Sequence, residues 1–346
     1  MTTAPRQGLP MLGLMLGDAT GIGPEQCARI LADRRMADAA RLLVVGDARV
    51  LEQGMRDAGV ALAWHSYGTP EEVDWDSLEI PIIDLNNLDP GGVRRGAVSA
   101  ESGRVSGATL ALMIELAVAQ RLDGIVFAPL NKAALHAGGW HFNDEHQMFA
   151  HLTRHQGFFG EMNVLDNLWM SRVTSHVSLR TALEQITGAR IDAALSLADA
   201  TMRAAGFATP RIAVAALNPH AGEGGLCGRE EIEIIAPAVA QAAQRGIACE
   251  GPYPADTVFL KAFGGEFDGV LTMYHDQGQI ATKLRGFNRG VTVTGGLETV
   301  FTTPAHGTAF DIVGKGIATT GALEQAIRLC ARLATSRRSS TANREP

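Results

Sequence analysis

The sequence predicts a two-lobed α/β protein with an α/β/α arrangement. The chain has 346 residues, and a single hydrophobic core stops growing at roughly 250–300 residues. Short apolar runs alternate with helix-length amphipathic stretches, which is the pattern of a mainly parallel sheet. Hydrophobic residues make up 46% of the chain and charged residues 19%. This composition allows a sizeable core to be buried.

The first part of the chain alternates strand and helix signals. We expect strands at 12–16, 42–45, 80–83 and 124–128, and helices at 24–35, 50–58 and 97–121. Pro81 predicts a sheet edge or a strand start for the third of these strands. A glycine-rich turn at 17–25 follows the first strand and opens the first helix. It fits either a tight structural turn or a loop whose free N–H groups bind an anion.

The second part repeats this alternation. We expect strands at 173–177, 211–217 and 269–273, and helices at 181–186, 191–206, 230–246 and 322–334. Polar motifs follow several strands, and parallel α/β sheets place their sites at the carboxyl ends of strands. We expect a first lobe from 1–130 plus 285–334, which binds the cofactor, and a second lobe at 131–284. Residues 335–346 are rich in Ser, Arg and Thr and are expected to form a disordered tail.

Charge and cysteine content exclude several classes of protein. The formal net charge is −7 and no long basic run precedes the tail, which argues against a nucleic-acid or membrane-surface partner. No segment approaches the ~20 apolar residues of a membrane span, and the N-terminus lacks a signal-peptide core. Four cysteines without a Cys-x-x-Cys pair are typical of reduced thiols. We therefore expect a cytoplasmic protein.

Three histidines lie in polar segments at the ends of predicted strands. They are His176 in Ser-His-Val-Ser, His220 in Asn-Pro-His-Ala-Gly-Glu, and His275 in Tyr-His-Asp-Gln. A divalent metal needs about three protein ligands and an open position for substrate. A lone loop histidine is usually a surface or hydrogen-bonding residue. Three of them with amide and carboxylate neighbours indicate a metal site.

Two further motifs have both a structural and a functional interpretation. Lys132 follows the predicted strand 124–128; it is either a solvated surface lysine or a proton-transfer group with a lowered pKa. The segment His306-Gly-Thr-Ala-Phe-Asp311 and the glycines after it suit an adenosine moiety. The same glycines would also suit a helix C-cap.

In their order along the chain, these motifs resemble the 4-hydroxythreonine-4-phosphate dehydrogenase family of pyridoxal phosphate biosynthesis. The resemblance covers residues 17–316. Its markers are Gly-Asp-x-x-Gly-Ile-Gly-Pro-Glu, Asn-Lys132, Asn-Pro-His220-Ala-Gly-Glu, Asp256-Thr-Val-Phe, Tyr-His275-Asp-Gln-Gly and His306-Gly-Thr-Ala. The segment from His306 also resembles the adenosine-binding loop of isocitrate and isopropylmalate dehydrogenases, which implies their two-lobed fold with an active site in the interlobe cleft.

The resemblance implies a homodimer that oxidises a small anionic hydroxy acid with NAD (or NADP) and then decarboxylates it. A divalent metal (Zn, Mg, Mn or Co) would polarise the alcohol and stabilise the enolate. The residues implied as metal ligands, drawn from both subunits, are His176, His220 and His275. Proton transfer or metal orientation would fall to Lys132 and Asp276. The implied cofactor-binding residues are His306, Gly307, Thr308 and Asp311.

The implied substrate-binding residues depart from the family pattern. Glu145 and His146 stand where the biosynthetic enzymes have a His-Thr pair. Lys283 matches a phosphate-contacting lysine, but its companion Asn and Arg are Thr292 and Phe301, and loss of a bidentate Arg weakens a phosphate site.

The segments Asp144-Glu-His146 and Thr302-Thr-Pro-Ala-His306 resemble a second paralogue group, which acts on acids such as D-threonate 4-phosphate. We therefore expect a phosphorylated hydroxy acid of the D-threonate 4-phosphate or 4-phosphohydroxythreonine type as substrate. The alternatives are a carboxylated cyclic dihydrodiol or, more distantly, a non-catalytic metal- or nucleotide-binding regulator.

Overall fold

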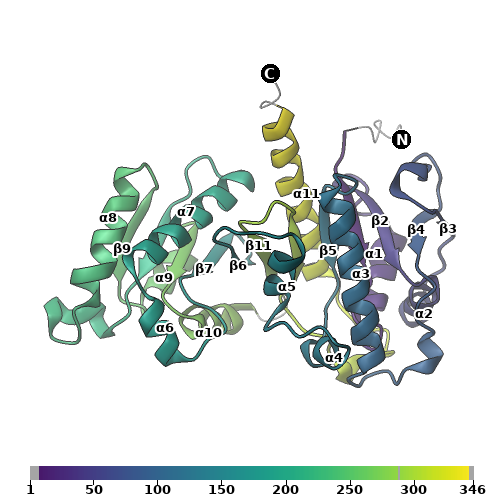
Figure 1. Ribbon diagram of the computed structural model, residues 1–346, viewed down its shortest axis with the longest axis horizontal. Helices are drawn as coiled ribbons and strands as arrows, with labels where there is room; N and C mark the ends of the chain where they lie inside the picture. Colours follow the sequence, from purple (N-terminus) through teal and green to yellow (C-terminus); the bar gives the residue numbers. More distant parts are fainter. Residues whose placement is uncertain (1–7, 287–288, 343–346) are drawn as a thin grey trace. The chain divides into compact units, whose positions relative to one another are not determined.

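The chain folds into two α/β units (Figure 1). The computed structural model describes residues 8–286 and 289–342. The first unit comprises residues 1–155 and 297–346, and the second comprises 156–296. The predicted α/β class is confirmed. None of the helices among the described residues has the length and apolarity needed to cross a membrane.

The first unit contains a parallel sheet with strand order β3-β4-β2-β1-β5-β12. Its strands are β1 (Met11–Met15), β2 (Arg41–Gly46), β3 (Trp64–Ser66), β4 (Ile80–Asp84), β5 (Gly124–Phe127) and β12 (Phe301–Pro304). Its helices are α1 (Gly23–Asp33), α2 (Ala48–Ala58), α3 (Ala100–Val118), α4 (Lys132–Ala137), α5 (Glu145–Leu152) and α11 (Gly321–Ala342). Pro81 is the second residue of β4, which lies between β3 and β2 and is therefore not an edge strand.

Alternate residues of this sheet pack against helices on opposite faces, as the two-residue period of a strand requires. Ile125 and Phe127 share one core with α3 and with Phe149 of α5. A side chain at Gly124 would instead meet the Sγ of Cys330 in α11. The sheet is therefore covered on both faces, which explains its nearly continuous apolar strands.

The second unit contains a mixed sheet with strand order β11-β6-β7-β10-β8-β9. Its strands are β6 (Gly160–Leu165), β7 (Leu168–Arg172), β8 (Ile212–Ala215), β9 (Cys249–Tyr253), β10 (Gly269–Thr272) and β11 (Val291–Gly295). Its helices are α6 (Leu179–Gln185), α7 (Gly188–Ala204), α8 (Ala236–Gln244), α9 (Val258–Phe263) and α10 (His275–Gly286). β6 pairs antiparallel with β7 and β11, whereas β7, β10, β8 and β9 run parallel.

Three expectations about the elements differ from the structure. The first unit continues to residue 155 and resumes at 297, rather than dividing at 130 and 285, because Met148 and Phe149 of α5 belong to the core of that unit. The strand expected at 173–177 lies earlier, as β7, and 173–177 form the loop after it.

The third difference concerns the expected disordered tail. Residues 335–342 continue α11, and Arg338 donates to the carbonyl oxygens of Gly8 and Leu9. This contact ties the end of the helix to the chain segment before β1. The last four residues of the expected tail lie outside the described residues.

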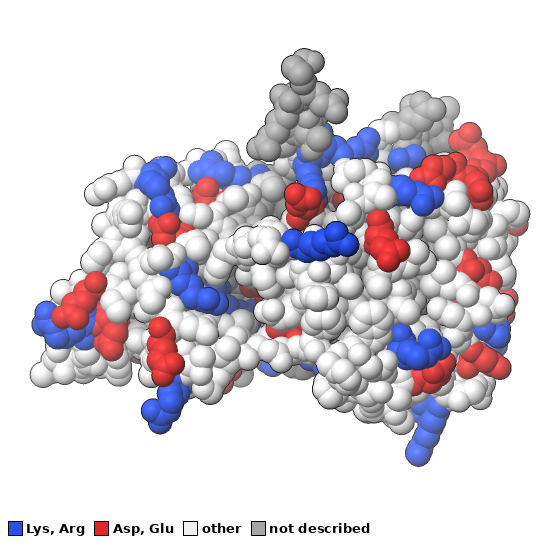
Figure 2. Space-filling view, viewed as in Figure 1, with Lys and Arg blue, Asp and Glu red and all other residues white. Residues whose placement is uncertain are grey.

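Charged side chains are interspersed by sign on the face shown in Figure 2. Many are paired with a neighbour, as in Arg104 with Glu101 and Arg121 with Glu71. The four cysteines are unpaired, and three of them are buried, as expected for reduced thiols.

Candidate active site

Two of the three predicted ligand histidines lie side by side in the second unit. His176 is in the loop after β7, and His275 begins α10 after β10. Because β7 and β10 are parallel neighbours, the loops at their carboxyl ends meet. The two ring centroids are 5.5 Å apart, and both side chains are partly exposed, 27% for His176 and 34% for His275.

The surroundings of His275 favour a neutral imidazole that can bind a metal. Burial lowers the pKa of His275 below its ordinary value and outweighs the hydrogen bond with Asp276, which alone would raise it. Nδ1 of His275 lies 2.7 Å from Oδ1 of Asp276. If Nδ1–H donates to this carboxylate, Nε2 keeps its lone pair for a ligand, as in carboxylate–histidine–metal arrangements.

His220 lies in a backbone loop of unusual conformation. Residues 220–224 all have positive φ, from 44° to 80°, including His220 at 52°. His176 also has a positive φ, of 44°. A left-handed conformation costs roughly 1–2 kcal/mol for a residue with a Cβ atom. Such strain persists where the surroundings enforce it and is common at functional sites.

Glu231 enforces the conformation of the His220 loop. Its carboxylate accepts hydrogen bonds from the backbone N–H groups of Leu217 and Asn218, at 2.8 and 2.7 Å, and from Nδ2 of Asn218 at 2.9 Å. Burial alone would raise the pKa of Glu231, but these hydrogen bonds outweigh it and lower the pKa. A Cβ at Gly222 would lie 2.7 Å from Oε2 of Glu231, so the loop can pack this closely only with glycine there.

The described part of a single chain does not complete a metal site. No group of three His, Cys, Asp or Glu side chains is arranged to hold a metal among residues 8–286 and 289–342. The His176–His275 pair fits two positions of a metal coordination sphere by its ligand type and by the lowered pKa of His275.

A buried polar cluster beneath this pair was not predicted from the sequence. It consists of Glu161 and Asn163 on β6, Arg172 at the end of β7, Gln279 on α10 and Thr292 on β11. Asn163 Nδ2 donates to Thr292 Oγ1 and to Glu161 Oε1, both at 3.1 Å. Arg172 donates to Asn163 Oδ1 and to Glu161 Oε1. Thr292, expected to bind substrate, therefore faces this cluster and is nearly fully buried.

The first unit contains Lys132 and Glu145, whose charged groups are 3.5 Å apart. Lys132 begins α4, where Asn131 caps the helix, and Glu145 begins α5, capped by Asp144. Lys132 is exposed and Glu145 is mostly buried. His146, beside Glu145, is buried with its ring 6.1 Å from that of Phe149. The two helix starts thus bring two predicted site residues together.

Phe301 and Lys283 have contrasting environments. Phe301 is fully buried and stacks on Phe149, with ring centroids 4.2 Å apart and planes inclined by 10°. It is a core residue of the first unit, so the position implied for a phosphate-binding arginine is not on the protein surface in this chain. Lys283 is exposed on α10.

The predicted adenosine loop is held by the glycine-rich turn near α1. Backbone N–H of Ile22 donates to the carbonyl of Thr308, and Gln26 Nε2 lies 3.4 Å from His306 Nε2. Burial lowers the pKa of His306 and outweighs the effect of its Gly307 contact. Gly307 and Asp311 are exposed, and a Cβ at Gly307 would meet open space. A ligand can therefore approach the backbone at Gly307.

The turn at 17–25 is itself buried. Asp18 accepts from the N–H and Oγ1 of Thr20 and from Oγ of Ser102. A Cβ at Gly17 would lie 2.7 Å from the carbonyl oxygen of Pro129. These contacts favour the interpretation of residues 17–25 as a tight structural turn. This turn also holds the loop at His306, through the hydrogen bond from Ile22 to Thr308.

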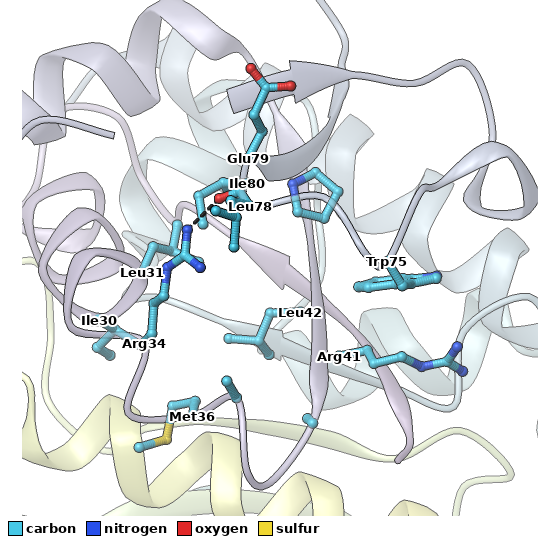
Figure 3. Close-up of a pocket in the computed structure, with 13 residues that line it drawn as sticks. Ile30, Leu31, Arg34, Met36, Arg41, Leu42, Trp75, Leu78, Glu79 and Ile80 are labelled. Carbon is cyan, nitrogen blue, oxygen red and sulfur yellow. Dashed lines mark hydrogen bonds between the residues drawn. The ribbon is translucent and has the colours of Figure 1, made fainter. Parts of the chain in front are cut away.

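An apolar pocket of about 80 Å³ lies elsewhere in the first unit (Figure 3). Leu42 and Ile80 line it at the amino ends of β2 and β4, and Arg34 donates across it to the carbonyl of Leu78. The candidate residues of this unit follow the carboxyl ends of strands, at the opposite edge of the sheet. The pocket is therefore not part of the candidate site.

The fold and these residues define a two-unit α/β dehydrogenase. The family model described as "Pyridoxal phosphate biosynthetic protein PdxA" matches residues 38–330, and the chain belongs to this family, whose related members are named as dehydrogenases. The chain is 48% identical to "Putative 4-hydroxythreonine-4-phosphate dehydrogenase 2" of Pseudomonas aeruginosa, over 94% of this chain and 97% of the relative. It is 43% identical to "D-threonate 4-phosphate dehydrogenase" of Cupriavidus necator, over 95% and 98%.

The chain is also similar to solved structures of dehydrogenases. A 4-hydroxythreonine-4-phosphate dehydrogenase from Klebsiella pneumoniae has a TM-score of 0.81 and 38% identity, covering 94% of this chain and 98% of that one. A terephthalate 1,2-cis-dihydrodiol dehydrogenase from Burkholderia xenovorans has a TM-score of 0.65 and 26% identity, covering 93% and 98%.

Proposed function

We propose that this protein is a metal-dependent dehydrogenase that uses NAD (or NADP) to oxidise a small phosphorylated hydroxy acid and then decarboxylates the product. Substrates of the D-threonate 4-phosphate or 4-phosphohydroxythreonine type fit the names of its relatives. The observation that supports the chemistry best is the His176–His275 pair, in which the pKa of His275 is lowered by burial and its ring contacts Asp276. A divalent cation held there would supply Lewis-acid stabilisation of the oxyanions formed in both steps.

The other residues have roles that follow from their surroundings. Asp276 fixes the ring orientation of His275. Lys132 takes part in proton transfer, with Glu145, at 3.5 Å, holding its side chain in place. Lys283, exposed at the last turns of α10, binds the anionic end of the substrate. The loop with His306, Gly307, Thr308 and Asp311 binds the adenosine part of the cofactor.

A homodimer would supply the third metal ligand, as His220 of the partner subunit. Apolar side chains are exposed on elements that carry or follow the histidine loops of the second unit, which supports an interface there. They include Leu179 and Leu183 on α6, Leu226 after the His220 loop and Leu284 on α10, with exposures from 50% to 85%. Large apolar side chains at this exposure are typical of surfaces that a second copy covers.

A non-phosphorylated substrate, such as a carboxylated cyclic dihydrodiol, is the alternative. It is favoured by Phe301, which is buried in the core where an arginine would be needed for a phosphate. The similarity to a dihydrodiol dehydrogenase supports the same alternative.

One assay separates these functions. Metal-free protein is supplied in turn with Zn²⁺, Mg²⁺, Mn²⁺ or Co²⁺, and NADH formation is followed with D-threonate 4-phosphate, 4-phosphohydroxythreonine, free D-threonate and a cyclic diol carboxylate. The proposal predicts metal-dependent turnover of a phosphorylated acid with release of carbon dioxide. Turnover of the diol alone would establish the alternative. Cofactor binding without turnover of any of these substrates would favour a non-catalytic regulator.

A further inference from the structure

A charged pair is buried directly behind the candidate metal ligands. The side chains of Arg172 and Glu161 are only 5% and 11% exposed, and their nearest charged atoms are 3.5 Å apart. Oε2 of the same glutamate lies 3.9 Å from Nε2 of His176. Glu161 thus has one carboxylate oxygen on the arginine side and the other on the histidine side.

Arg172 holds this glutamate through several hydrogen bonds rather than through charge alone. It donates to Glu161 Oε1 and to Asn163 Oδ1, and Asn163 donates to the same glutamate oxygen at 3.1 Å. Gln279 Nε2 donates to the same Asn163 oxygen at 2.7 Å. A fixed planar guanidinium of this kind sets the orientation of the groups around it.

A buried ion pair is weak evidence for stability, because desolvation offsets most of its attraction. Packing therefore does not by itself explain charges at this position. The separation of 3.9 Å between Glu161 and His176 is too long for a hydrogen bond. The Glu161 carboxylate therefore acts on the His176 ring through its charge and not through a hydrogen bond. Such a charge lowers the free energy of a cation bound at the ring, since Coulomb attraction to a mostly buried carboxylate is stronger than between charges in bulk water.

We propose that Glu161 and Arg172 are positioning residues of the metal site, with Arg172 fixing the Glu161 carboxylate beside His176 so that its charge favours a divalent cation at the His176–His275 pair. This inference rests on the proposed function. Through Asn163, the same cluster reaches Thr292. It therefore connects the metal ligands to a residue implied in substrate binding.

The test is calorimetric titration of the metal-free, full-length protein with Co²⁺. We expect the conservative variant Glu161→Gln to weaken Co²⁺ binding by about 10–100-fold, which is the usual effect of losing an outer-shell partner. Arg172→Met should weaken it as well, because the freed carboxylate can turn away from His176; we expect this loss to exceed the gain from removing the positive charge of Arg172 near His275. The matched control is the exposed pair Glu101 and Arg104, where Glu101→Gln should leave Co²⁺ affinity unchanged.

The double variant Glu161→Gln/Arg172→Met separates positioning from folding. Removing one partner of a buried pair leaves an uncompensated charge, whereas removing both restores stability. We therefore expect the double variant to unfold at nearly the wild-type temperature and still to bind Co²⁺ weakly. Wild-type Co²⁺ affinity in the double variant, or in Glu161→Gln, would overturn the inference.

Metal binding by the wild-type protein distinguishes a failure of the proposed function from a failure of this inference. If the wild-type protein binds no divalent metal at all, the proposed function is wrong and this inference falls with it. If the wild-type protein binds Co²⁺ and the variants bind equally well, only the role of Glu161 and Arg172 is wrong.

Discussion

The rings of Phe149 and Phe301 stack face to face, with centroids 4.2 Å apart and planes inclined by 10°. This stack ties α5, which bears Glu145 and His146, to β12 of the first sheet. Both rings are fully buried. An apolar contact therefore positions the start of α5. In this contact, Phe301 occupies the position for which the family resemblance implies a phosphate-binding arginine.

Truncating this stack should be strongly destabilising. We expect Phe301→Ala to lower the free energy of unfolding by about 3–5 kcal/mol, as for other buried phenylalanines, measured by urea unfolding. Phe301→Leu keeps most of the volume and serves as the control, with a smaller loss. If Phe301→Ala costs less than about 1 kcal/mol, the size of a surface effect, the stack does not hold α5.

Adding a methyl group at Gly103 should disturb the proton-transfer residue. An added Cβ there would lie 1.8 Å from the carbonyl oxygen of Ala134, so α4 would have to move away from α3. Overpacking of this kind costs roughly 1–3 kcal/mol, and it should also lower kcat because Lys132 begins α4. Gly188→Ala is the control, since its Cβ would meet open space. An unchanged melting temperature and kcat for Gly103→Ala would show that α4 is not fixed by this contact.

The role of Lys132 can be tested with little risk to folding, because its side chain is 57% exposed. We expect Lys132→Met to lower kcat by about 10²–10⁴-fold, the usual contribution of a general acid or base, with little change in melting temperature. Glu145→Gln should have a smaller effect in the same direction, since it removes the partner and not the amine. Full activity of Lys132→Met would show that this lysine is a solvated surface residue, which is the other interpretation that its sequence context allows.

The His220 loop should lose stability in acid. The pKa of Glu231 is lowered from 4.5, so its stabilising effect is complete above that pH and is lost as the pH falls through the lower folded-state pKa. The glutamine of Glu231→Gln has no carboxylate to protonate, so this loss of stability in acid is absent from the variant. We therefore expect the melting temperature of the wild type to exceed that of Glu231→Gln clearly at pH 7, and the difference to shrink below about pH 4. A difference that does not vary with pH would exclude this role of the carboxylate.

The sequence predicts the fold class and the type of site because both depend on local patterns. Apolar strands followed by polar loops indicate a parallel α/β sheet, and His176 and His275 do follow neighbouring strands, though their adjacency depends on the strand order β7-β10. Strand order depends on long-range pairing, so spacing along the chain cannot specify it.

The polar cluster at Glu161 cannot be predicted from the sequence for a reason other than strand order. Glu161 and Asn163 alternate with Met162 and Val164 in β6, and this two-residue period was a signal for a strand. However, the polar side chains of β6 contact the buried Arg172 in the interior of the unit. From their polarity alone, they would be expected on an exposed face of the strand. The Phe149–Phe301 stack is likewise a contact between distant segments that no local pattern predicts.

Subunit complementation tests the central claim most directly. If His176 and His275 of one chain share a metal with His220 of the partner subunit, the homodimers of His220→Ala and of His275→Ala are both inactive. After subunit exchange, half of the dimers are mixed, and each of these has one complete site. The account therefore predicts recovery of about a quarter of the wild-type rate of metal-dependent NADH formation. No recovery, with mixed dimers shown to form, would contradict it.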